Sequence, residues 1–299
     1  MIKYSIIIPH YNCPQLLCRL LKTIPQRDDT EVIVVDDNSS QDNVAKLKEL
    51  ERQFVKIHFI FSKENGGGGK SRNIGINHAT GIYLLFADSD DYFNVCLNDI
   101  LDDYKDETVD MIMFGSNSVD SDTYQNSNRA NLYAPTVNKY DGANDFDLRY
   151  NFGVPWSRMV RKALVINNNI KFQETIRHND VGFAYLVGYY AKTIKADKRA
   201  IYCVTTREGS VSTNESYDAM KDGLMVYIKK HKFLLSKGID LGYPFYFSYS
   251  LYNMRHKKEQ FNQCLNYILD NGYNKQKVLL MYWRFRVIKF LGKIKMLVC

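Results

Sequence analysis

The chain has 299 residues, of which 45% are hydrophobic, an ordinary globular composition that allows one large domain or two small ones. Its formal charge of +7 is concentrated at one end: residues 221–299 carry 15 Lys and Arg against 4 Asp and Glu, a net charge of +11, which leaves −4 for residues 1–220. This distribution argues against a nucleic-acid channel through the core and favours contact between the C-terminal quarter and an anionic surface.

The six cysteines form no C-x-x-C pair and have no histidines at zinc-ligand spacing, so the sequence predicts neither a disulfide framework nor a structural zinc. The apolar run that follows Met1 is too short for a signal peptide, and no stretch approaches the ~18 uncharged residues of a membrane span. We therefore expect free thiols and a cytoplasmic protein that can touch the inner face of the cell membrane.

The first 115 residues alternate short β-branched runs with longer segments of helical period. The runs that predict strands are residues 4–8, 31–36, 56–61, 83–88 and 111–115, and the segments that predict helices are residues 14–24, 42–53 and 70–78. Repeated strand and helix units indicate an α/β fold with a Rossmann-like, mostly parallel sheet flanked by helices. Ligands of such sheets bind beyond the carboxyl ends of the strands.

Polar or special residues follow four consecutive predicted strands at that edge. They are Pro9-His10-Tyr11-Asn12, Asp36-Asp37-Asn38, Lys63-Glu64-Asn65-Gly66 and Asp88-Ser89-Asp90-Asp91. A turn alone would be served by any Gly, Asn or Asp, so four such strand ends together indicate a shared ligand site.

The run Asp88-Ser89-Asp90-Asp91 presents three carboxylates directly after an apolar strand. Carboxylates this close repel one another, and a hard divalent cation that takes oxygen ligands from one or two of them and from substrate phosphates would make the cluster favourable. The structural alternative is a helix N-cap with acidic residues in the first turn.

Two other turns are ambiguous when taken alone. Asp36-Asp37-Asn38 can be a turn and N-cap, or its carboxylates can accept a ring N–H of a base or a ribose hydroxyl. The glycine run that ends at Lys70 resembles the end of a P-loop, but Glu64 stands where the first glycine is needed. Lys70 and Arg72 can still meet a diphosphate at a helix start, and a flexible loop with a solvated basic turn is the alternative.

Together these elements resemble family 2 glycosyltransferases of the GT-A fold. The match runs from Pro9-His10-Tyr11-Asn12 through residues 35–42 and 65–75 to the D-S-D-D cluster, in the order and spacing of the family. It is strong over about the first 115 residues and thinner to about residue 212, where residues 156–162 and 207–212 also look like family segments.

The resemblance implies a nucleotide-sugar donor, usually a UDP-sugar, and a divalent metal. The donor-binding residues that it implies are Pro9, Tyr11, Asp37, Lys70, Arg72, Asp88 and Ser89, and the implied ligands of Mn²⁺ or Mg²⁺ are Asp88 and Asp90. The family inverts the anomeric carbon in one displacement, which requires a carboxylate base for the acceptor hydroxyl and a metal for the leaving diphosphate.

The family carries this base on the Asp of a Glu-Asp pair at a helix start, and the corresponding string here is Arg177-His178-Asn179-Asp180. The resemblance therefore implies Asp180 as the catalytic base, with a plain N-cap as the structural alternative. Asn179 departs from the family Glu, and this departure leaves the contacts to the acceptor open.

The remaining sequence predicts less. Residues 116–150 are polar and weakly patterned, which predicts a long loop or short edge strands, whereas residues 217–299 have helical period throughout. We expect a GT-A domain over residues 1–215, with a nucleotide-sugar half (1–115) and an acceptor half (116–215), followed by a basic helical region over residues 216–299.

The C-terminal segment 279–298 interleaves aromatic and aliphatic residues with five Lys and Arg. A helix of this kind fits the plane of an anionic membrane interface, and the alternative is a docked terminal helix with a solvated basic face. The basic tail favours peripheral membrane contact through residues 279–299.

The sequence thus predicts an inverting, metal-dependent glycosyltransferase. It would move a hexose or N-acetylhexosamine from a UDP-sugar to a saccharide hydroxyl, on a lipid-linked or surface polysaccharide precursor, with no nucleic-acid partner. Two alternatives stay open: a noncatalytic nucleotide-sugar binding protein, suggested by Asn179, and a P-loop-like ATPase or kinase, against which Glu64 and the D-S-D-D cluster argue.

Overall fold

The structure is a computed structural model, and it describes residues 1–207 and 215–292. The chain divides into two compact units. The first comprises Met1–Glu174 and Gly182–Glu208, and the second comprises Thr175–Val181 and Gly209–Cys299.

The first unit is built on an eight-stranded sheet with the strand order β3-β2-β1-β4-β7-β6-β8-β5. The strands β3, β2, β1 and β4 are parallel, β7 is antiparallel to both neighbours, and β6 and β8 are parallel to each other. This arrangement confirms the predicted α/β class with a mostly parallel sheet. The strands are β1 (Tyr4–His10), β2 (Thr30–Asp36), β3 (Ile57–Phe61), β4 (Tyr83–Phe86), β5 (Tyr92–Phe93), β6 (Met111–Asp120), β7 (Arg158–Arg161) and β8 (Ile194–Thr206).

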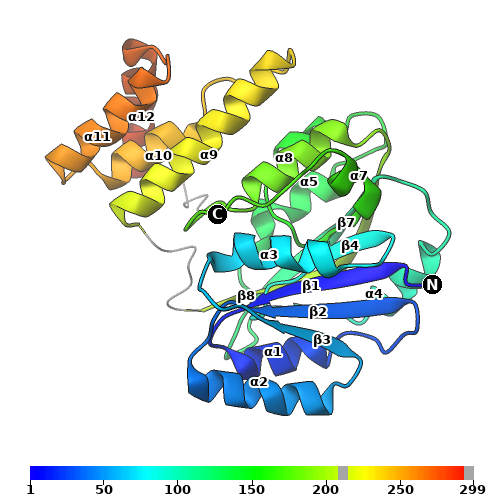
Figure 1. The fold of residues 1–299 in the computed structure, drawn as a ribbon. Coiled ribbons are helices and arrows are strands. Elements are labelled where there is room, and N and C mark those ends of the chain that lie inside the picture. The colour runs from blue at the N-terminus through cyan, green and yellow to red at the C-terminus, as the bar shows by residue number, and fades with distance from the viewer. Residues whose placement is uncertain (208–214, 293–299) are drawn as a thin grey trace. The chain divides into compact units, whose positions relative to one another are not determined.

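Helices cover both faces of this sheet: α1 and α2 lie on one face and α3 on the other (Figure 1). The helix α1 turns Leu17, Leu20 and Leu21 inward, as its period predicts. On the opposite face, a Cβ at Gly75 would lie 2.4 Å from Cγ2 of Ile7, so glycine allows α3 to pack closely on β1. The helices are α1 (Pro14–Leu21), α2 (Gln41–Gln53), α3 (Gly67–His78), α4 (Leu97–Asp103), α7 (Lys162–Asn167) and α8 (Val181–Tyr190).

Residues 116–150 correct the sequence prediction. They begin with the end of β6, where residues 116–120 pair with β8 and not with β7, and continue into the short helices η1 (Ala130–Leu132), α5 (Ala134–Asn138) and α6 (Phe146–Tyr150). The prediction of a loop or short edge strands allowed for this strand end, in which Ser116 and Ser118 are buried, but it missed the three short helices. The Ser118 hydroxyl is satisfied internally, since it donates to the carbonyl of Ser127 and accepts from the amide of Ala130, both at 2.9 Å.

The second unit is helical over the residues described. It contains α9 (Tyr217–Ser236), α10 (Phe245–Asn253), α11 (Lys258–Asp270) and α12 (Lys275–Phe290). Its core is rich in aromatic rings from α10, from α12 and from the residues before α12, among them Phe247, Tyr273 and Phe285. No helix in the described part of the chain combines the length and apolarity that a membrane span requires.

Candidate active site

The carboxyl ends of β2, β1 and β4 lie next to one another. His10 at the end of β1 is in register with Asp36 at the end of β2, and Ile7 of β1 is in register with Phe86 at the end of β4. The turns that follow these strands therefore meet at one edge of the sheet, where ligands of parallel α/β sheets bind.

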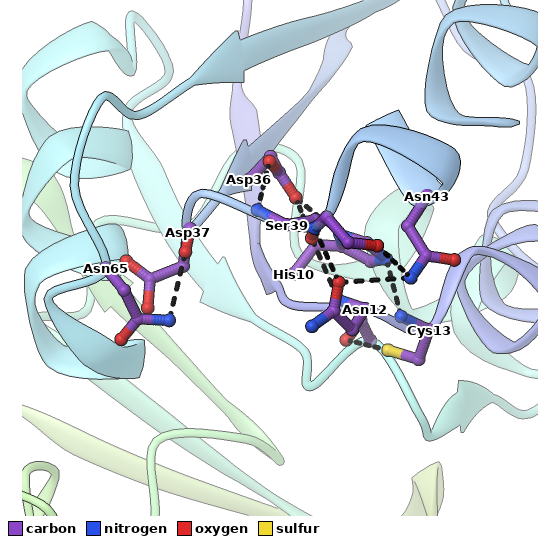
Figure 2. A network of polar contacts seen from close by, with 10 residues as sticks. His10, Asn12, Cys13, Asp36, Asp37, Ser39, Asn43 and Asn65 are labelled. Carbon is purple, nitrogen blue, oxygen red and sulfur yellow. Dashed lines mark hydrogen bonds and ion pairs between the residues drawn. The ribbon is translucent and has the colours of Figure 1, made fainter. Parts of the chain in front are cut away.

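The turn after β2 is closed by hydrogen bonds within the protein (Figure 2). The amide of Cys13 donates to Nε2 of His10 at 3.2 Å, so the ring carries its proton on Nδ1 and donates it to Oδ1 of Asp36 at 2.9 Å. The amide of Ser39 donates to Oδ2 of Asp36 at 3.0 Å, and the Ser39 hydroxyl donates to Oδ1. Burial opposes ionisation of Asp36, but these hydrogen bonds outweigh it and lower the pKa of the carboxyl below its ordinary value.

Asp37 is also engaged by the protein itself. Its two carboxylate oxygens accept the amides of Gly66 at 2.9 Å and of Gly67 at 2.7 Å, and its carbonyl accepts the side-chain amide of Asn65 at 3.1 Å. Gly67 has a φ of +79°, a left-handed conformation that favours glycine. The anion at the N-terminus of α3 is therefore the Asp37 carboxylate, and base binding by Asp37 stays a prediction.

The two basic residues of α3 lie in different surroundings. The ammonium of Lys70 is 3.5 Å from a carboxylate oxygen of Glu64 and is partly exposed. Arg72 is buried, with its guanidinium 5.3 Å from the ring centroid of Phe172, and its Nη2 pairs with Oδ1 of Asp88. Arg72 therefore connects α3 to the acidic turn after β4.

That acidic turn is fastened to β8 through Asp91. The Tyr202 hydroxyl accepts the amide of Asp88 at 2.7 Å and donates to Oδ2 of Asp91 at 2.9 Å, while the amide of Thr205 donates to Oδ1 of Asp91 at 2.7 Å. Burial raises the pKa of Asp91 well above its ordinary value, and the charges of Asp90 and Asp88 add to this effect. Asp91 thus anchors the turn, and it is not available at the surface.

Asp90 is held differently. Its Oδ2 lies 3.1 Å from Nε of Arg207, and its carbonyl accepts hydrogen bonds from the Thr205 hydroxyl at 2.7 Å and from the guanidinium of Arg19. Burial and the charge of Asp88 raise the pKa of the Asp90 carboxyl, and Arg207 partly offsets them. Asp88 and Asp90 are therefore each balanced by an arginine, Arg72 and Arg207.

The other predicted donor-binding residues flank this turn. Ser89 is buried, with its hydroxyl 3.2 Å from the thiol of Cys13. Pro9 lies within β1, and the ring of Tyr11 is 52% exposed just after that strand. The sheet thus brings Tyr11, Asp37 and Ser89 to one edge.

The donor atoms of Asp88 and Asp90 fit a hard divalent cation, since Mn²⁺ and Mg²⁺ prefer carboxylate oxygens. Within residues 1–207 and 215–292, no group of three or more His, Cys, Asp and Glu side chains is arranged to hold a metal. A metal at this turn would therefore take its further ligands from substrate phosphates and water.

Asp180 lies in the second unit, half-buried, in the turn that precedes α8. The turn is anchored within that unit: the amide of Ile176 donates to Asp222 of α9 at 2.8 Å, and the ring of His178 packs edge-on against Tyr246 of α10 at 4.8 Å between centroids. These contacts fix the segment that carries the predicted base.

Three residues at the site escape prediction from the sequence. Arg19 is the one basic residue of α1, between buried leucines, a signal that could have pointed to a buried role. Arg207 lies in a segment that resembles the family, but nothing in that segment indicates a bond to Asp90. Tyr202 looks like an ordinary strand residue, and its contact with Asp91 spans 111 positions.

Comparisons with known proteins show the family of the chain. The family described as "Glycosyl transferase family 2" matches residues 5–167, more than half of the chain. The chain is 28% identical over 241 residues to the poly(ribitol-phosphate) beta-N-acetylglucosaminyltransferase TarS of Staphylococcus aureus, covering 74% of this chain and 40% of that protein. It is 35% identical over 94 residues to the GalNAc(5)-diNAcBac-PP-undecaprenol beta-1,3-glucosyltransferase of Campylobacter jejuni, covering 30% of each.

Solved structures show the same fold. The structure of residues 1–349 of S. aureus TarS in complex with UDP-GlcNAc aligns with a TM-score of 0.65 and 21% identity, covering 94% of this chain and 84% of that one. The mannosyltransferase PcManGT from Pyrobaculum calidifontis, in complex with GDP-Man and Mn²⁺, aligns with a TM-score of 0.57 and 14% identity, covering 98% and 81%.

The chain therefore belongs to glycosyl transferase family 2, and the predicted GT-A fold is confirmed. It spans about 40% of the length of TarS and about 30% of the length of the C. jejuni relative.

Proposed function

We propose that the chain is an inverting, metal-dependent glycosyltransferase that moves a hexose or N-acetylhexosamine from a UDP-sugar to a saccharide hydroxyl. The observation that carries this proposal is the pairing of Asp88 and Asp90 with Arg72 and Arg207 at the end of β4. Two carboxylates and two guanidinium groups at one strand end can exchange their mutual bonds for bonds to a metal and a diphosphate.

On the donor side, each residue has a distinct task in this proposal. Asp88 and Asp90 would hold Mn²⁺ or Mg²⁺, which would supply positive charge for the leaving diphosphate. Arg72 and Arg207, once released from the carboxylates, donate to phosphate oxygens. Tyr11 and Asp37 flank the nucleotide base, with Tyr11 offering an exposed ring at the end of β1.

On the acceptor side, Asp180 acts as the general base. Its carboxylate accepts the proton of the acceptor hydroxyl, whose oxygen forms a bond to the anomeric carbon while the bond from that carbon to the diphosphate breaks. The electron pair of the broken bond leaves with UDP, and the single displacement inverts the anomeric centre. Asn179 beside the base donates or accepts hydrogen bonds but adds no second negative charge.

The relatives support the choice of donor and acceptor class. TarS is named for N-acetylglucosamine transfer to a poly(ribitol-phosphate) and is solved with UDP-GlcNAc, and the C. jejuni relative is named for an undecaprenol-linked acceptor. We infer a lipid-linked or surface polysaccharide precursor as the acceptor of this chain, met at the inner face of the cell membrane.

A panel of nucleotide sugars tests the proposal. Release of UDP from UDP-hexoses and UDP-N-acetylhexosamines should exceed release of GDP from GDP-mannose, and a chelator should abolish it. Activity that persists unchanged in the chelator would remove the metal from the proposal. ATP hydrolysis without dependence on a sugar would favour the P-loop alternative.

The variant Asp180→Asn distinguishes the proposed enzyme from a noncatalytic binding protein. This variant should bind UDP as the wild type does and lose transfer by about 10²- to 10⁴-fold, the usual contribution of a general base. Near-normal turnover in the variant would exclude Asp180 as the base. Binding of UDP-sugar with no turnover in the wild type, across the panel and several oligosaccharide acceptors, would favour a binding protein.

A further inference from the structure

The helix α12 carries apolar residues on two opposite faces. One face is buried in the core of the helical unit through Val278, Tyr282 and Phe285. The other face is exposed through Leu280, Trp283, Val287 and Leu291, with exposed fractions of 52%, 55%, 55% and 57%. Positions spaced by three or four residues lie on one side of a helix, so these four form a continuous stripe. The sequence alternatives of a docked helix and an exposed apolar helix therefore apply to different faces.

We call Leu280, Trp283, Val287 and Leu291 the apolar stripe. Basic residues border it: at about 100° per residue, Lys277 and Arg284 lie beside one edge, and Arg286 lies toward the other. The guanidinium of Arg286 is 4.6 Å from the ring centroid of Trp283. The helix Lys275–Phe290 contains five Lys and Arg and no Asp or Glu, so the surroundings of the stripe on this helix are uniformly positive.

A groove beside the stripe extends the apolar surface toward α9. Leu280 of the stripe lines it together with Met281 of α12, Leu235 of α9 and Tyr243, and its volume is about 410 Å³. Lys277, Asp240, His231 and Gly242 complete the lining. The exposed apolar surface is thus broader than one row of side chains.

A second copy of the chain is a poor match for the stripe. A helix of 16 residues is about 24 Å long and about 10 Å wide, so one face offers about 240 Å², well below the ~800 Å² per partner of a stable interface. Two such faces would also bring Lys277, Arg284 and Arg286 of one helix toward the same residues of the other.

An anionic lipid surface matches both properties, because it accepts apolar side chains below its head groups and attracts Lys and Arg at the level of its phosphates. We propose that the apolar stripe of α12 lies in the plane of an anionic membrane, with Leu280, Trp283 and Val287 below the head groups and Arg284 and Arg286 at the phosphates. The helix lies on the membrane and does not cross it. This docking goes beyond the proposed transfer reaction and does not depend on it.

Fluorescence of the full chain can test the proposal directly, because the chain has only two tryptophans. Trp156 is buried and Trp283 is 55% exposed, so a blue shift on binding reports Trp283. Mixed phosphatidylcholine and phosphatidylglycerol vesicles should shift the emission to the blue, protect it from acrylamide and sediment the protein. Pure phosphatidylcholine vesicles should do so much less, and 1 M salt should weaken the anionic effect.

Matched variants separate the apolar and ionic contributions. Leu280→Ser with Val287→Ser keeps the Trp283 probe and should weaken vesicle partitioning by about tenfold or more. Arg284→Gln with Arg286→Gln should weaken binding to anionic vesicles by about 20- to 30-fold and leave binding to neutral vesicles unchanged. The control pair Val55→Ser with Val95→Ser removes two exposed valines of the first unit and should change neither.

Two results would overturn the proposal. One is wild-type protein that neither sediments with anionic vesicles nor changes its Trp283 quenching, a measurement that needs no variant. The other is wild-type protein that self-associates in light scattering, becomes monomeric in the Leu280→Ser and Val287→Ser variant, and ignores vesicles. That second pattern would assign the stripe to a second copy of the chain.

Discussion

Two acidic turns at neighbouring strand ends use the same residue type in opposite ways. After β2, Asp36 and Asp37 are closed by an imidazole, a hydroxyl and backbone amides. After β4, the carboxylates of Asp88 and Asp90 are balanced by the side chains of Arg72 and Arg207.

The two turns differ in whether a ligand can replace the groups that bind their carboxylates. Backbone amides and the buried ring of His10 are fixed by the fold, so the turn after β2 is part of the framework. A guanidinium can exchange a carboxylate for a phosphate as its hydrogen-bond partner, so the carboxylates after β4 can become available to a metal without unfolding of the turn. A carboxylate at a strand end is therefore not a ligand-binding group by position alone. The groups that bind the carboxylate decide its role.

The largest expected effect comes from Asp90→Ala. Transfer should fall by about a thousandfold, because the variant loses a metal ligand that stabilises the leaving diphosphate. The free energy of unfolding should change by only about 0–1 kcal/mol, since the lost ion pair is partly exposed. Steady-state kinetics and urea unfolding measure the two quantities.

The control for Asp90→Ala is Asp103→Ala at the end of α4, which removes a similar ion pair with Arg199 of β8. It should retain full activity. Equal losses of activity in both variants, or loss of the fold in Asp90→Ala, would contradict the assigned role.

Asp36→Ala should lower stability more than activity, in contrast to Asp90→Ala. It removes the acceptor of His10 Nδ1 and of the Ser39 hydroxyl inside the protein, which should destabilise the fold by about 1–3 kcal/mol. Activity of the folded fraction should fall far less than in Asp90→Ala. Glu49→Ala, at an exposed position of α2, is the control and should change stability by about 0.5 kcal/mol or less. Unchanged stability in Asp36→Ala would show that the turn after β2 does not stabilise the fold.

Tyr202→Phe should lower both activity and stability. It deletes the hydroxyl that fastens Asp88 and Asp91 to β8, so transfer should fall about tenfold through misplacement of the turn. Tyr83→Phe is the matched control, because its buried hydroxyl donates to the carbonyl of Val109 at 2.8 Å, at the far end of β4. Both should cost about 1–3 kcal/mol of stability. If the two variants lose activity equally, the loss belongs to stability and not to the turn.

The smallest expected effect concerns Arg207→Gln. Without its partner, Asp90 should bind Mn²⁺ in the absence of donor about two- to fivefold more tightly, which corresponds to the modest energy of a partly exposed ion pair. Electron paramagnetic resonance of free Mn²⁺ measures this affinity. Arg199→Gln, which removes the same kind of pair from Asp197, is the control and should leave it unchanged. Weaker Mn²⁺ binding in Arg207→Gln would show that Arg207 does not compete with the metal.

The sequence predicts the elements of residues 1–115 well because the signals there are local. Periodicity over 8–13 residues identified α1, α2 and α3, and the polar strand ends placed Asp37 and Asp88 at the same edge. Those strands are parallel neighbours, so a local pattern was enough to predict what lies together.

The parts that could not be predicted depend on contacts between distant residues. Arg19 reaches the carbonyl of Asp90 across 71 positions and Tyr202 reaches Asp91 across 111, and no local pattern encodes either bond. The helices η1, α5 and α6 were missed because each has only three to five residues, too few for a helical period to show. In α12, apolar residues surround the helix, so only packing against α10 shows which face is left exposed.

The most direct test of the contrast between the two turns is calorimetric titration of UDP into the wild type and into Asp90→Asn, each with Mn²⁺ and with a chelator. We predict that Mn²⁺ raises the affinity of the wild type for UDP by about tenfold or more and leaves that of Asp90→Asn unchanged. Wild-type affinity that is the same with Mn²⁺ and with the chelator would contradict the role of the turn after β4.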